Sequence, residues 1–350
     1  MTPSRKRSEH SLAVVIPAYN AEATIRDCLD ALGRSDRRPD EIIIFDDGST
    51  DGTDQIARDA GASVIRKGPA RQGPARGRNV GANAASASIV VFVDADVAVH
   101  PEALRRLEAP LLAGEAVASF GSYDDRPKSR RLAALYANLR HHWVHQHGRS
   151  NAFTFWSGLG AIRADTLCAL NGFDERFTEP SIEDIDLGIR IVESGGRIRL
   201  VKDALGTHHK DWGLLQLWKT DIFCRAIPWA QLIRQGRGRA NDLNISTVER
   251  VSAVVAYLVL IAAIVAMVQP GAWPGLILAL AAYVTLNARF LAFVFRAGGF
   301  RAGIAGTILH WCYHIYASAT FAVVTGLFPL LRPRKKIMTA TAGRTQATRP

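Results

Sequence analysis

Two aspartates separated by one alanine follow an apolar run in the first third of the chain. The run is IVVFV, residues 89–93, and Asp94 and Asp96 come directly after it. Side chains two residues apart in an extended segment point to the same side, so the two carboxylates can converge. Converging carboxylates need a cation between them, and Mg2+ or Mn2+ binds protein carboxylates while substrate phosphates complete its coordination. The pair therefore predicts a divalent-cation site. A solvated loop acid followed by a helix N-cap is the plainer interpretation.

Polar residues also end two earlier apolar runs, LAVVIPA and EIIIFD. These residues are Pro17, Tyr19 and Asn20 after the first run, and Asp46 and Asp47 after the second. Ligands of open parallel sheets bind outside the carboxyl ends of the strands, so these side chains could hold a nucleoside by stacking and hydrogen bonding. Turn chemistry alone also favours Asp and Asn at such places. Three neighbouring runs that all end in polar residues strengthen the functional interpretation.

The elements that must position these residues alternate along the chain. The spacing of apolar residues predicts strands at 12–18, 41–46, 62–65 and 89–94, with helices at 22–33, 53–60 and 74–87 between them. Further helices are expected after Pro101 and at 128–147 and 184–194. Strands that are apolar almost throughout indicate a sheet covered on both faces. The pattern predicts an α/β fold with a doubly wound, mostly parallel sheet.

The last part of the chain is apolar and basic. Residues 251–268, 273–295 and 302–331 are apolar runs about long enough to cross a bilayer, and only Arg289 interrupts the second. The whole chain has 43 Lys and Arg against 32 Asp and Glu, a net charge of +11, but from residue 247 onward ten basic residues face the single acid Glu249. Basic residues that flank apolar runs indicate membrane topology rather than a nucleic-acid-binding face.

The charges next to the apolar runs predict an orientation in the membrane. The 296–301 loop carries two arginines and the 269–274 turn carries none, so the first span should run outward and the second inward. The large N-terminal domain would then lie in the cytoplasm. A full crossing by the third run would put RPRKK outside, against the positive-inside rule. The third run is therefore re-entrant or interfacial, or the tail violates the rule, and the number of crossings stays at two or three.

Seven short motifs occur in a fixed order over residues 12–230. They are VVIPAYN, DDGSTDGT, GPARGRNVGA, VDADV, SGLGAIRAD, NGFDERF and EDIDLGIR. No single motif is specific, but the set resembles that of the family 2 glycosyltransferases. The resemblance implies a GT-A fold that binds a nucleotide-diphosphate sugar and transfers the sugar with inversion.

The resemblance also implies roles for individual residues. Asp46 or Asp47 would contact the nucleoside, Asp94 would lie near the ribose and diphosphate, Asp96 would coordinate the metal, and Asp184 would be the general base. The full set of predicted donor-binding residues, which adds two arginines to those that the resemblance implies, is Pro17, Tyr19, Asn20, Asp46, Asp47, Arg78, Asp94 and Arg225.

The chemistry of sugar transfer agrees with these roles. Cleavage of a sugar–diphosphate bond builds negative charge that a metal stabilises, and an acceptor hydroxyl must lose its proton as it attacks. Glu183 and Asp184 are adjacent at a helix start and do not share a face, so one can be the base while the other is structural. The plainer interpretation is that both are acids favoured by the helix dipole. A lipid phosphate acceptor is already anionic and would need no base.

Histidines and a tryptophan-rich segment follow the predicted base. In GTHHKDW, His208 aligns better than His209 with the histidine that many family members place near the metal, and a loop histidine is the alternative. The segment LLQLWKTDIFCRAIPWAQLI predicts an amphipathic helix at the membrane interface with Trp218 and Trp229 as anchors. Arg225 in this segment would reach the donor diphosphate, an acceptor phosphate or lipid headgroups.

The helix at 128–147 carries four histidines that suggest a metal site. They are His141, His142, His145 and His147. We favour a solvated or acceptor-facing surface helix over a metal site here.

The sequence therefore predicts an inverting, metal-dependent glycosyltransferase with Mn2+ or Mg2+ as cofactor. It would act on a lipid-linked or other membrane-bound acceptor in cell-envelope or polysaccharide biosynthesis, as a multi-pass protein of the inner (plasma) membrane. The alternatives are a polyprenyl-phosphate sugar transferase and a non-catalytic sugar- or lipid-binding membrane protein. A dinucleotide-binding oxidoreductase lacks support because PAYNAE, and not GxGxxG, follows the first strand. The expected segments are a disordered N-terminus at 1–11, the GT-A domain at 12–230, a linker at 231–246, a membrane region at 247–331 and a disordered tail at 332–350.

Overall fold

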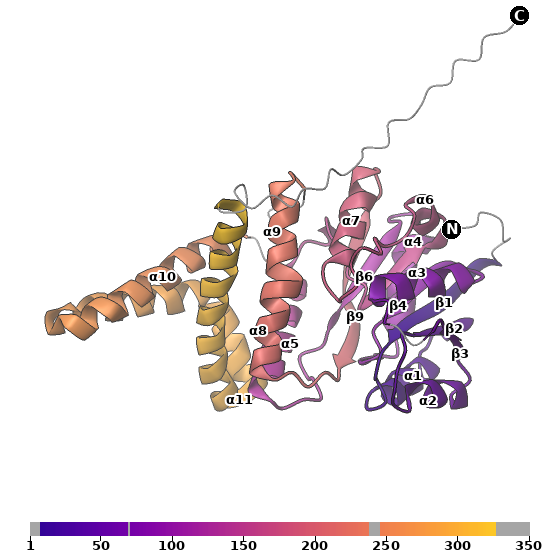
Figure 1. Cartoon of the computed structure of the whole chain (residues 1–350), viewed down its shortest axis with the longest axis horizontal. Coiled ribbons are helices and arrows are strands. Elements are labelled where there is room, and N and C mark those ends of the chain that lie inside the picture. Colours follow the sequence, from indigo (N-terminus) through magenta and orange to yellow (C-terminus); the bar gives the residue numbers. More distant parts are fainter. Residues whose placement is uncertain (1–7, 69–70, 238–245, 327–350) are drawn as a thin grey trace, which may run out of the picture.

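The computed structural model describes residues 8–68, 71–237 and 246–326. An α/β domain comes first, and long helices follow from residue 247 (Figure 1). Most of the N-terminal segment and the whole tail at 332–350, both expected to be disordered, lie outside the described residues. Residues 8–11 were also expected to be disordered, but this is wrong because the first strand begins at Ser8.

One nine-stranded mixed sheet forms the centre of the domain. Its strands lie in the order β3-β2-β1-β4-β8-β6-β9-β5, and the short strand β7 pairs with the first residues of β9. The first four strands are parallel, as expected, and β8 pairs antiparallel with β4 and β6. The bounds are β1 (Ser8–Ala18), β2 (Glu41–Asp46), β3 (Ser63–Arg66), β4 (Ala87–Val93), β5 (Val97–Val99), β6 (Ala118–Tyr123), β7 (Asn151–Ala152), β8 (Leu159–Arg163) and β9 (Ile198–His208).

Both faces of the sheet are buried, which explains the continuous apolar runs. In β1, Leu12 and Val14 belong to one hydrophobic core and Ala13 and Val15 to the other, because side chains alternate across a strand. One core also takes α1 (Ile25–Gly33), α2 (Thr53–Asp59) and α4 (Ala103–Leu112). The other takes α3 (Pro74–Ala84), α6 (Ala164–Ala169) and α7 (Glu183–Glu193). The expected doubly wound α/β architecture is confirmed.

A second layer of helices joins the domain to the C-terminal region. The expected amphipathic helix forms as three consecutive segments, α8 (Leu214–Lys219), the π-helix η1 (Thr220–Ala226) and α9 (Ile227–Arg234). Helix α9 therefore extends into the linker that we expected at 231–246. Helix α5 (Leu132–His147) packs between β6 and the last helix of the chain. Its residues Leu135 and Leu139 are buried, so the expectation of a surface helix is wrong for this part of α5.

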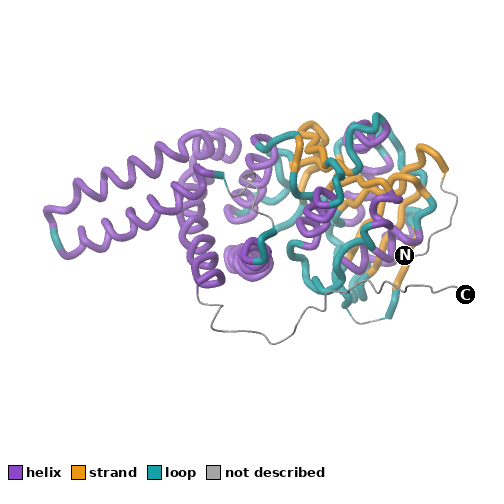
Figure 2. Tube along the Cα trace, turned by 90° about the horizontal axis from the view of Figure 1, so that it is seen from above, coloured by secondary structure: helices purple, strands orange, loops and turns teal. Residues whose placement is uncertain are grey.

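Two apolar helices form a hairpin that projects from the domain (Figures 1 and 2). They are α10 (Thr247–Val268) and the first part of α11 (Trp273–Gly326), joined by the short helix η3 (Pro270–Ala272). Helix α10 has 22 residues, and its length of about 33 Å matches a bilayer core. Large apolar side chains such as Leu258, Met267 and Leu278 are exposed on the hairpin. By length and composition, both helices are candidates to span a membrane.

A kink at Gly299 divides α11 into two parts. Gly299 has φ 80° and ψ 179°, a conformation that only glycine adopts without strain. After the kink, the helix turns across the base of the hairpin and lies beside α9 (Figure 1). The third apolar run therefore packs on two sides: against the base of the hairpin, where Nε1 of Trp311 donates to the backbone O of Ala256, and against α9 and η1. Its last residues, 327–331, lie outside the described residues.

Candidate active site

The Asp94–Asp96 pair lies at the carboxyl end of β4, where the chain turns back into β5. The turn is closed by a hydrogen bond from the backbone N of Val97 to the backbone O of Asp94. Strand β5 pairs antiparallel with β9, with Val97 opposite His208, so the end of β9 is carried to the aspartates. As a result, Nε2 of His208 lies 3.7 Å and Nζ of Lys210 lies 3.9 Å from Oδ2 of Asp96. Burial acts to raise the pKa of Asp96, but His208 and Lys210 outweigh it and hold this pKa well below its usual value.

This geometry separates the two candidate histidines. His208 is buried and stacks on Tyr123 with ring centroids 4.2 Å apart, so its imidazole faces Asp96 in a fixed position. His209 turns away from the aspartate pair, and its Nδ1 lies 3.1 Å from Oδ2 of Asp27. The arrangement favours His208 as the histidine of the metal site.

Arg78 connects the aspartate pair to the acids at the start of α7. Its Nη2 donates to Oδ1 of Asp94 at 2.8 Å, and its Nη1 donates to Oε1 of Glu183 at 2.8 Å. Both Arg78 and Glu183 are buried. Burial and the charge of Asp96 nevertheless raise the pKa of Asp94, against the opposing effect of Arg78. Glu183 is thus committed to an internal ion pair, which leaves its neighbour Asp184 as the carboxylate available for chemistry.

Asp184 is the second residue of α7, and it lines the same cavity. Its Oδ2 accepts hydrogen bonds from the backbone N and the Oγ of Ser157, at 3.2 Å and 3.4 Å. Burial and the charge of Glu183 raise the pKa of Asp184 to about 7, against the opposing effect of Arg78. A carboxylate with this pKa is matched to proton abstraction near neutral pH.

The expected nucleoside-binding residues lie at the carboxyl ends of β1 and β2. Ala18 pairs with Asp46 across these strands, so the two polar ends adjoin, and Pro17 pairs with Phe45. The side chain of Tyr19 is 43% exposed, and the guanidinium of Arg71 lies 4.7 Å from its ring centroid. These residues do not line the cavity that contains Asp96 and Asp184. They form a neighbouring edge of the same surface.

Several of these residues already build the loops around them. The amide oxygen of Asn20 accepts from the backbone N of Thr50 at 2.9 Å. Asp46 is fully buried, and its Oδ1 accepts from the backbone N of Ser49. Both carboxylate oxygens of Asp47 accept backbone N–H groups of residues 72 and 73, which fixes the loop before α3. Asp46 and Asp47 therefore shape the loops at this edge of the sheet, and the contacts do not single out either one as the expected nucleoside contact.

One cavity of about 1030 Å3 joins the catalytic candidates to the C-terminal helices. At one end it is lined by Arg78, Asp94, Asp96, Asp184 and His208. Its walls also include residues that sequence reasoning missed or misjudged, namely Tyr123, Arg140, His141, His145, Trp156, Asp221 and Trp229. The spacing of four residues between the two α5 histidines was the only signal in the sequence that they share a face.

The segment 214–234 was expected to lie at the membrane interface, but Trp229 and Arg225 of this segment line the cavity. Trp229 is partly buried, whereas Leu215 and Phe223 are exposed apolar residues on the same segment. Trp218 is also partly buried, and the role of both tryptophans as membrane anchors stays a prediction. Arg225 also lines the cavity, where its Nη1 donates to Oδ1 of Asp221 at 2.9 Å. This contact is compatible with either a donor or an acceptor phosphate near Arg225.

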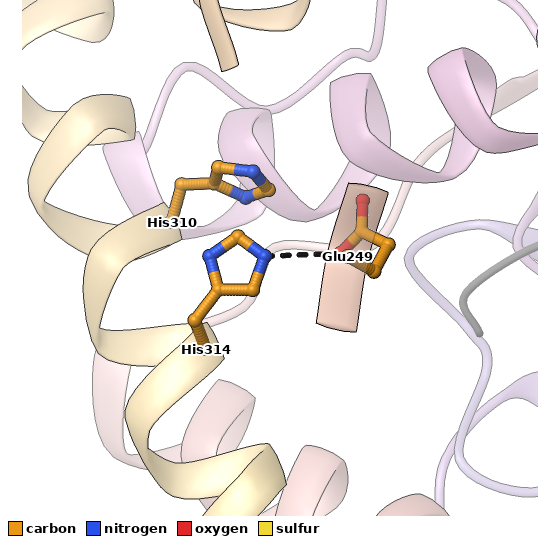
Figure 3. A group of neighbouring side chains, drawn as sticks. All are labelled: Glu249, His310 and His314. Atoms are coloured by element: carbon orange, nitrogen blue, oxygen red, sulfur yellow. Dashed lines mark hydrogen bonds and ion pairs between the residues drawn. The ribbon is translucent and has the colours of Figure 1, made fainter. Parts of the chain in front are cut away.

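A polar cluster lies where α5, α10 and α11 meet, at the far end of the cavity (Figure 3). Candidate ligand atoms of Glu249, His310 and His314 lie within 4.8 Å of one another. Each ring nitrogen of the two histidines already has a protein partner: Tyr136, Asn287, Tyr283 and Glu249. The hydrogen bonds of the histidines are therefore complete without an ion. We interpret the cluster as a structural connection between α5 and the hairpin.

Comparisons with known proteins agree with this geometry. Residues 13–168 match the model of glycosyl transferase family 2. Glucosyl-3-phosphoglycerate synthase of Mycobacterium tuberculosis is 36% identical over 129 residues, which cover 35% of this chain and 40% of that protein. Validoxylamine A glucosyltransferase of Streptomyces hygroscopicus subsp. limoneus is 28% identical over 259 residues, which cover 62% of this chain and 57% of the relative. The match thus spans about half or less of the length of these relatives.

A solved structure shows the same fold over most of the chain. It is a mannosyltransferase from Pyrobaculum calidifontis in complex with GDP-Man and Mn2+, with a TM-score of 0.54 and 21% identity. The likeness covers 91% of this chain and 89% of that one, so it extends into the C-terminal helices. Residues 13–168 therefore match glycosyl transferase family 2, and they lie in a domain with the GT-A fold.

Proposed function

We propose that this protein transfers a sugar, with inversion, from a nucleotide-diphosphate donor to a membrane-associated acceptor. The observation that carries the proposal is the single cavity that holds Asp94, Asp96 and Asp184 and continues to α10 and α11. Two relatives are named as glucosyltransferases or glucosyl synthases, and the archaeal structure contains GDP-Man and Mn2+. These names support a nucleotide-sugar donor and a divalent cation for this chain as well.

Asp96 and His208 are the residues that would hold the cation. An ionised carboxylate and a neutral imidazole are ligands that suit Mn2+, and a carboxylate suits Mg2+. The low pKa of Asp96 keeps it ionised at neutral pH. A bound cation would neutralise the negative charge that develops on the leaving diphosphate.

The remaining catalytic work falls to side chains of this chain. Asp184 takes the proton of the acceptor hydroxyl as the oxygen attacks the anomeric carbon. Ser157 fixes the orientation of the Asp184 carboxylate through its backbone N and its Oγ. Arg78 holds Asp94 at the donor side and Glu183 beside the base, so one buried guanidinium sets the distance between the two halves of the site.

The C-terminal hairpin is proposed to anchor the enzyme in the inner (plasma) membrane. Monomeric soluble proteins rarely expose apolar surfaces as continuous as that of α10 and the first part of α11. The tip of the hairpin is uncharged, whereas Arg296 and Arg301 lie near its base, so the domain would face the cytoplasm. Two crossings, with the second part of α11 at the interface, also keep the basic run RPRKK on the cytoplasmic side. An anchored catalytic domain suits a lipid-linked acceptor in cell-envelope or polysaccharide biosynthesis.

A nucleotide-release assay tests the proposed reaction. Full-length protein in detergent is incubated with UDP-, GDP- and dTDP-sugars and Mn2+ or Mg2+, with polyprenyl phosphate added or omitted. We expect one donor to be turned over in the presence of metal, and the Asp96→Asn variant to lose that turnover. Release that strictly requires polyprenyl phosphate would favour the polyprenyl-phosphate sugar transferase. No release and no nucleotide binding by calorimetry would favour the non-catalytic alternative.

A further inference from the structure

The cavity has an inner arm that the proposed reaction does not explain. We define the inner arm by six lining residues, Arg140, His141, Trp212, Asp221, Trp229 and Tyr313. They come from α5, the segment after β9, η1, α9 and the second part of α11. The inner arm thus lies between the catalytic residues and the C-terminal helices.

Four buried polar atoms in the inner arm have no hydrogen-bond partner among the described residues. They are Nη1 of Arg140, Nε2 of His141, Nε1 of Trp212 and Nε1 of Trp229. A buried polar group without a partner destabilises a fold, so such groups are few in native proteins and each needs an explanation. The Arg and Trp atoms are N–H groups that can only donate. A ligand that satisfies them must present oxygen atoms that accept.

The electrostatics of the inner arm favour an anionic ligand. The guanidinium of Arg140 lies 3.7 Å from the ring centroid of Tyr313, which fixes its plane. Its carboxylate neighbour Asp221 is 3.6 Å away and is shared with Arg225 at 2.9 Å and with the hydroxyl of Tyr316 at 2.6 Å. Two guanidinium groups therefore face one carboxylate. Arginine is also the side chain whose planar donors fit phosphate oxygens best.

The far end of the cavity has a different chemistry. Beyond the inner arm, apolar side chains of α10 and α11, such as Val254 and Phe321, line the cavity next to polar residues of the same helices, which are Glu249, Arg250, Tyr257, His314 and Ser318. Val254 is 62% exposed and Phe321 is 44% exposed, so the cavity reaches the apolar surface of the C-terminal helices. A molecule that fills the whole cavity would place its reactive group near Asp184, an anionic group in the inner arm and an apolar tail against α10 and α11.

We infer that the inner arm binds a phosphate or diphosphate of an amphiphilic acceptor, with Arg140 as its main anchor and the N–H groups of Trp212 and Trp229 as further donors. This inference rests on the proposed function, since it names the acceptor class of the same site. The anionic group is separate from the nucleophile, because it lies in the inner arm and the acceptor hydroxyl lies at Asp184. Arg140 acts as a binding residue and takes no part in bond cleavage.

Binding of paired probes tests this inference without any sugar transfer. Farnesyl diphosphate and farnesol share a tail and differ in the anionic group, and inorganic pyrophosphate has the anionic group alone. Full-length protein in detergent is titrated with each probe, and the dissociation constant is measured by calorimetry. Since hydrogen bonds to charged groups contribute about 1.5–3 kcal/mol, we expect farnesyl diphosphate to bind about 10- to 100-fold more tightly than farnesol.

Variants locate the binding in the inner arm. Arg140→Gln should abolish the difference between the two farnesyl probes, whereas Arg105→Gln, which changes an exposed arginine of α4, should preserve it. Trp229→Phe removes the indole N–H together with part of the ring and should weaken the binding of farnesyl diphosphate several-fold more than that of farnesol, so it carries the test if Arg140→Gln does not fold. Equal binding of farnesol and farnesyl diphosphate, or an unchanged difference in Arg140→Gln, would overturn the inference and leave water as the partner of these donors. If pyrophosphate bound as tightly as farnesyl diphosphate, the apolar tail would contribute nothing to binding, and the claim that the ligand is amphiphilic would be overturned.

The outcome is independent of whether the proposed reaction occurs. If no nucleotide is released but farnesyl diphosphate still binds, the proposed function is overturned and the inner arm remains a binding site for an amphiphile. Nucleotide release without probe binding would keep the glycosyltransferase and overturn the inner arm as an acceptor subsite.

Discussion

The pH dependence of the reaction depends on Asp184, whose pKa is raised to about 7 by burial and by Glu183. The general base acts in its ionised form, so activity must rise with pH through this value. With a pKa of about 7, about 9% of Asp184 is ionised at pH 6 and about 91% at pH 8. We therefore expect kcat/KM for the nucleotide sugar to rise about tenfold between pH 6 and pH 8.

Asp184→Asn isolates this effect. An asparagine has nearly the same shape and its amide oxygen can still accept from Ser157, so donor binding should be retained. Loss of a general base lowers kcat by about 10²- to 10⁴-fold, and the residual rate should no longer vary with pH in this window. Initial rates of nucleotide release at pH 6, 7 and 8, with saturating metal, measure both quantities.

Thermal unfolding provides the control for folding of the variant. The folded state binds the Asp184 proton more tightly than the unfolded chain does, because its pKa is raised on folding. The ionised carboxylate therefore destabilises the fold above pH 7, and Asp184→Asn should unfold at the same or a higher temperature than wild type at pH 8. A flat wild-type profile, or a variant that keeps the wild-type profile, would refute the assignment of the base. Loss of donor binding would show that Asp184 belongs to the donor site.

Three further perturbations test the geometry of the domain. His208→Ala should raise the Mn2+ concentration needed for half-maximal turnover at least tenfold, and His209→Ala should leave it unchanged. A larger effect of His209→Ala would contradict His208 as the metal ligand. Arg78→Met leaves the two carboxylates that it bridges without a cation, and should lower the free energy of unfolding by about 3–5 kcal/mol, measured by denaturation in detergent. Gly73→Ala places a Cβ 2.3 Å from a backbone oxygen at a positive φ, whereas Gly61→Ala, also at a positive φ, meets nothing within 4 Å. Gly73→Ala should therefore lower the melting temperature clearly more than Gly61→Ala, and equal effects would contradict the packing of the loop before α3.

Local patterns in the sequence predict most of the sheet and the two carboxylate positions. Apolar runs buried on both faces have few alternatives to a parallel sheet, and Asp94 and Asp96 follow directly from where β4 ends. The position of His208 depends on the pairing of β5 with β9, strands about 100 residues apart, which no local pattern contains. For the same reason the link from Arg78 to Glu183 could not be predicted, because it joins residues 105 positions apart.

Helix α5 shows a different limit of sequence reasoning. Its many basic and histidine side chains indicated a surface, but Tyr136 and Leu139 pack against α11, and Nδ1 of His145 donates to the backbone O of Gly121. Burial between two elements from distant parts of the chain overrides the polarity of the helix. The inner arm escaped prediction for this reason, since Arg140 belongs to the same helix.

The most direct test of the account follows the sugar itself. Membrane vesicles that contain the full-length protein are incubated with the radiolabelled nucleotide sugar that is turned over, and the label is partitioned between aqueous and organic phases. We predict that label enters the organic phase in the presence of Mn2+ or Mg2+ and that the Asp96→Asn variant does not transfer label to this phase. Nucleotide release with all label left in the aqueous phase would contradict a lipid-linked acceptor, and unchanged transfer by Asp96→Asn would contradict the metal site.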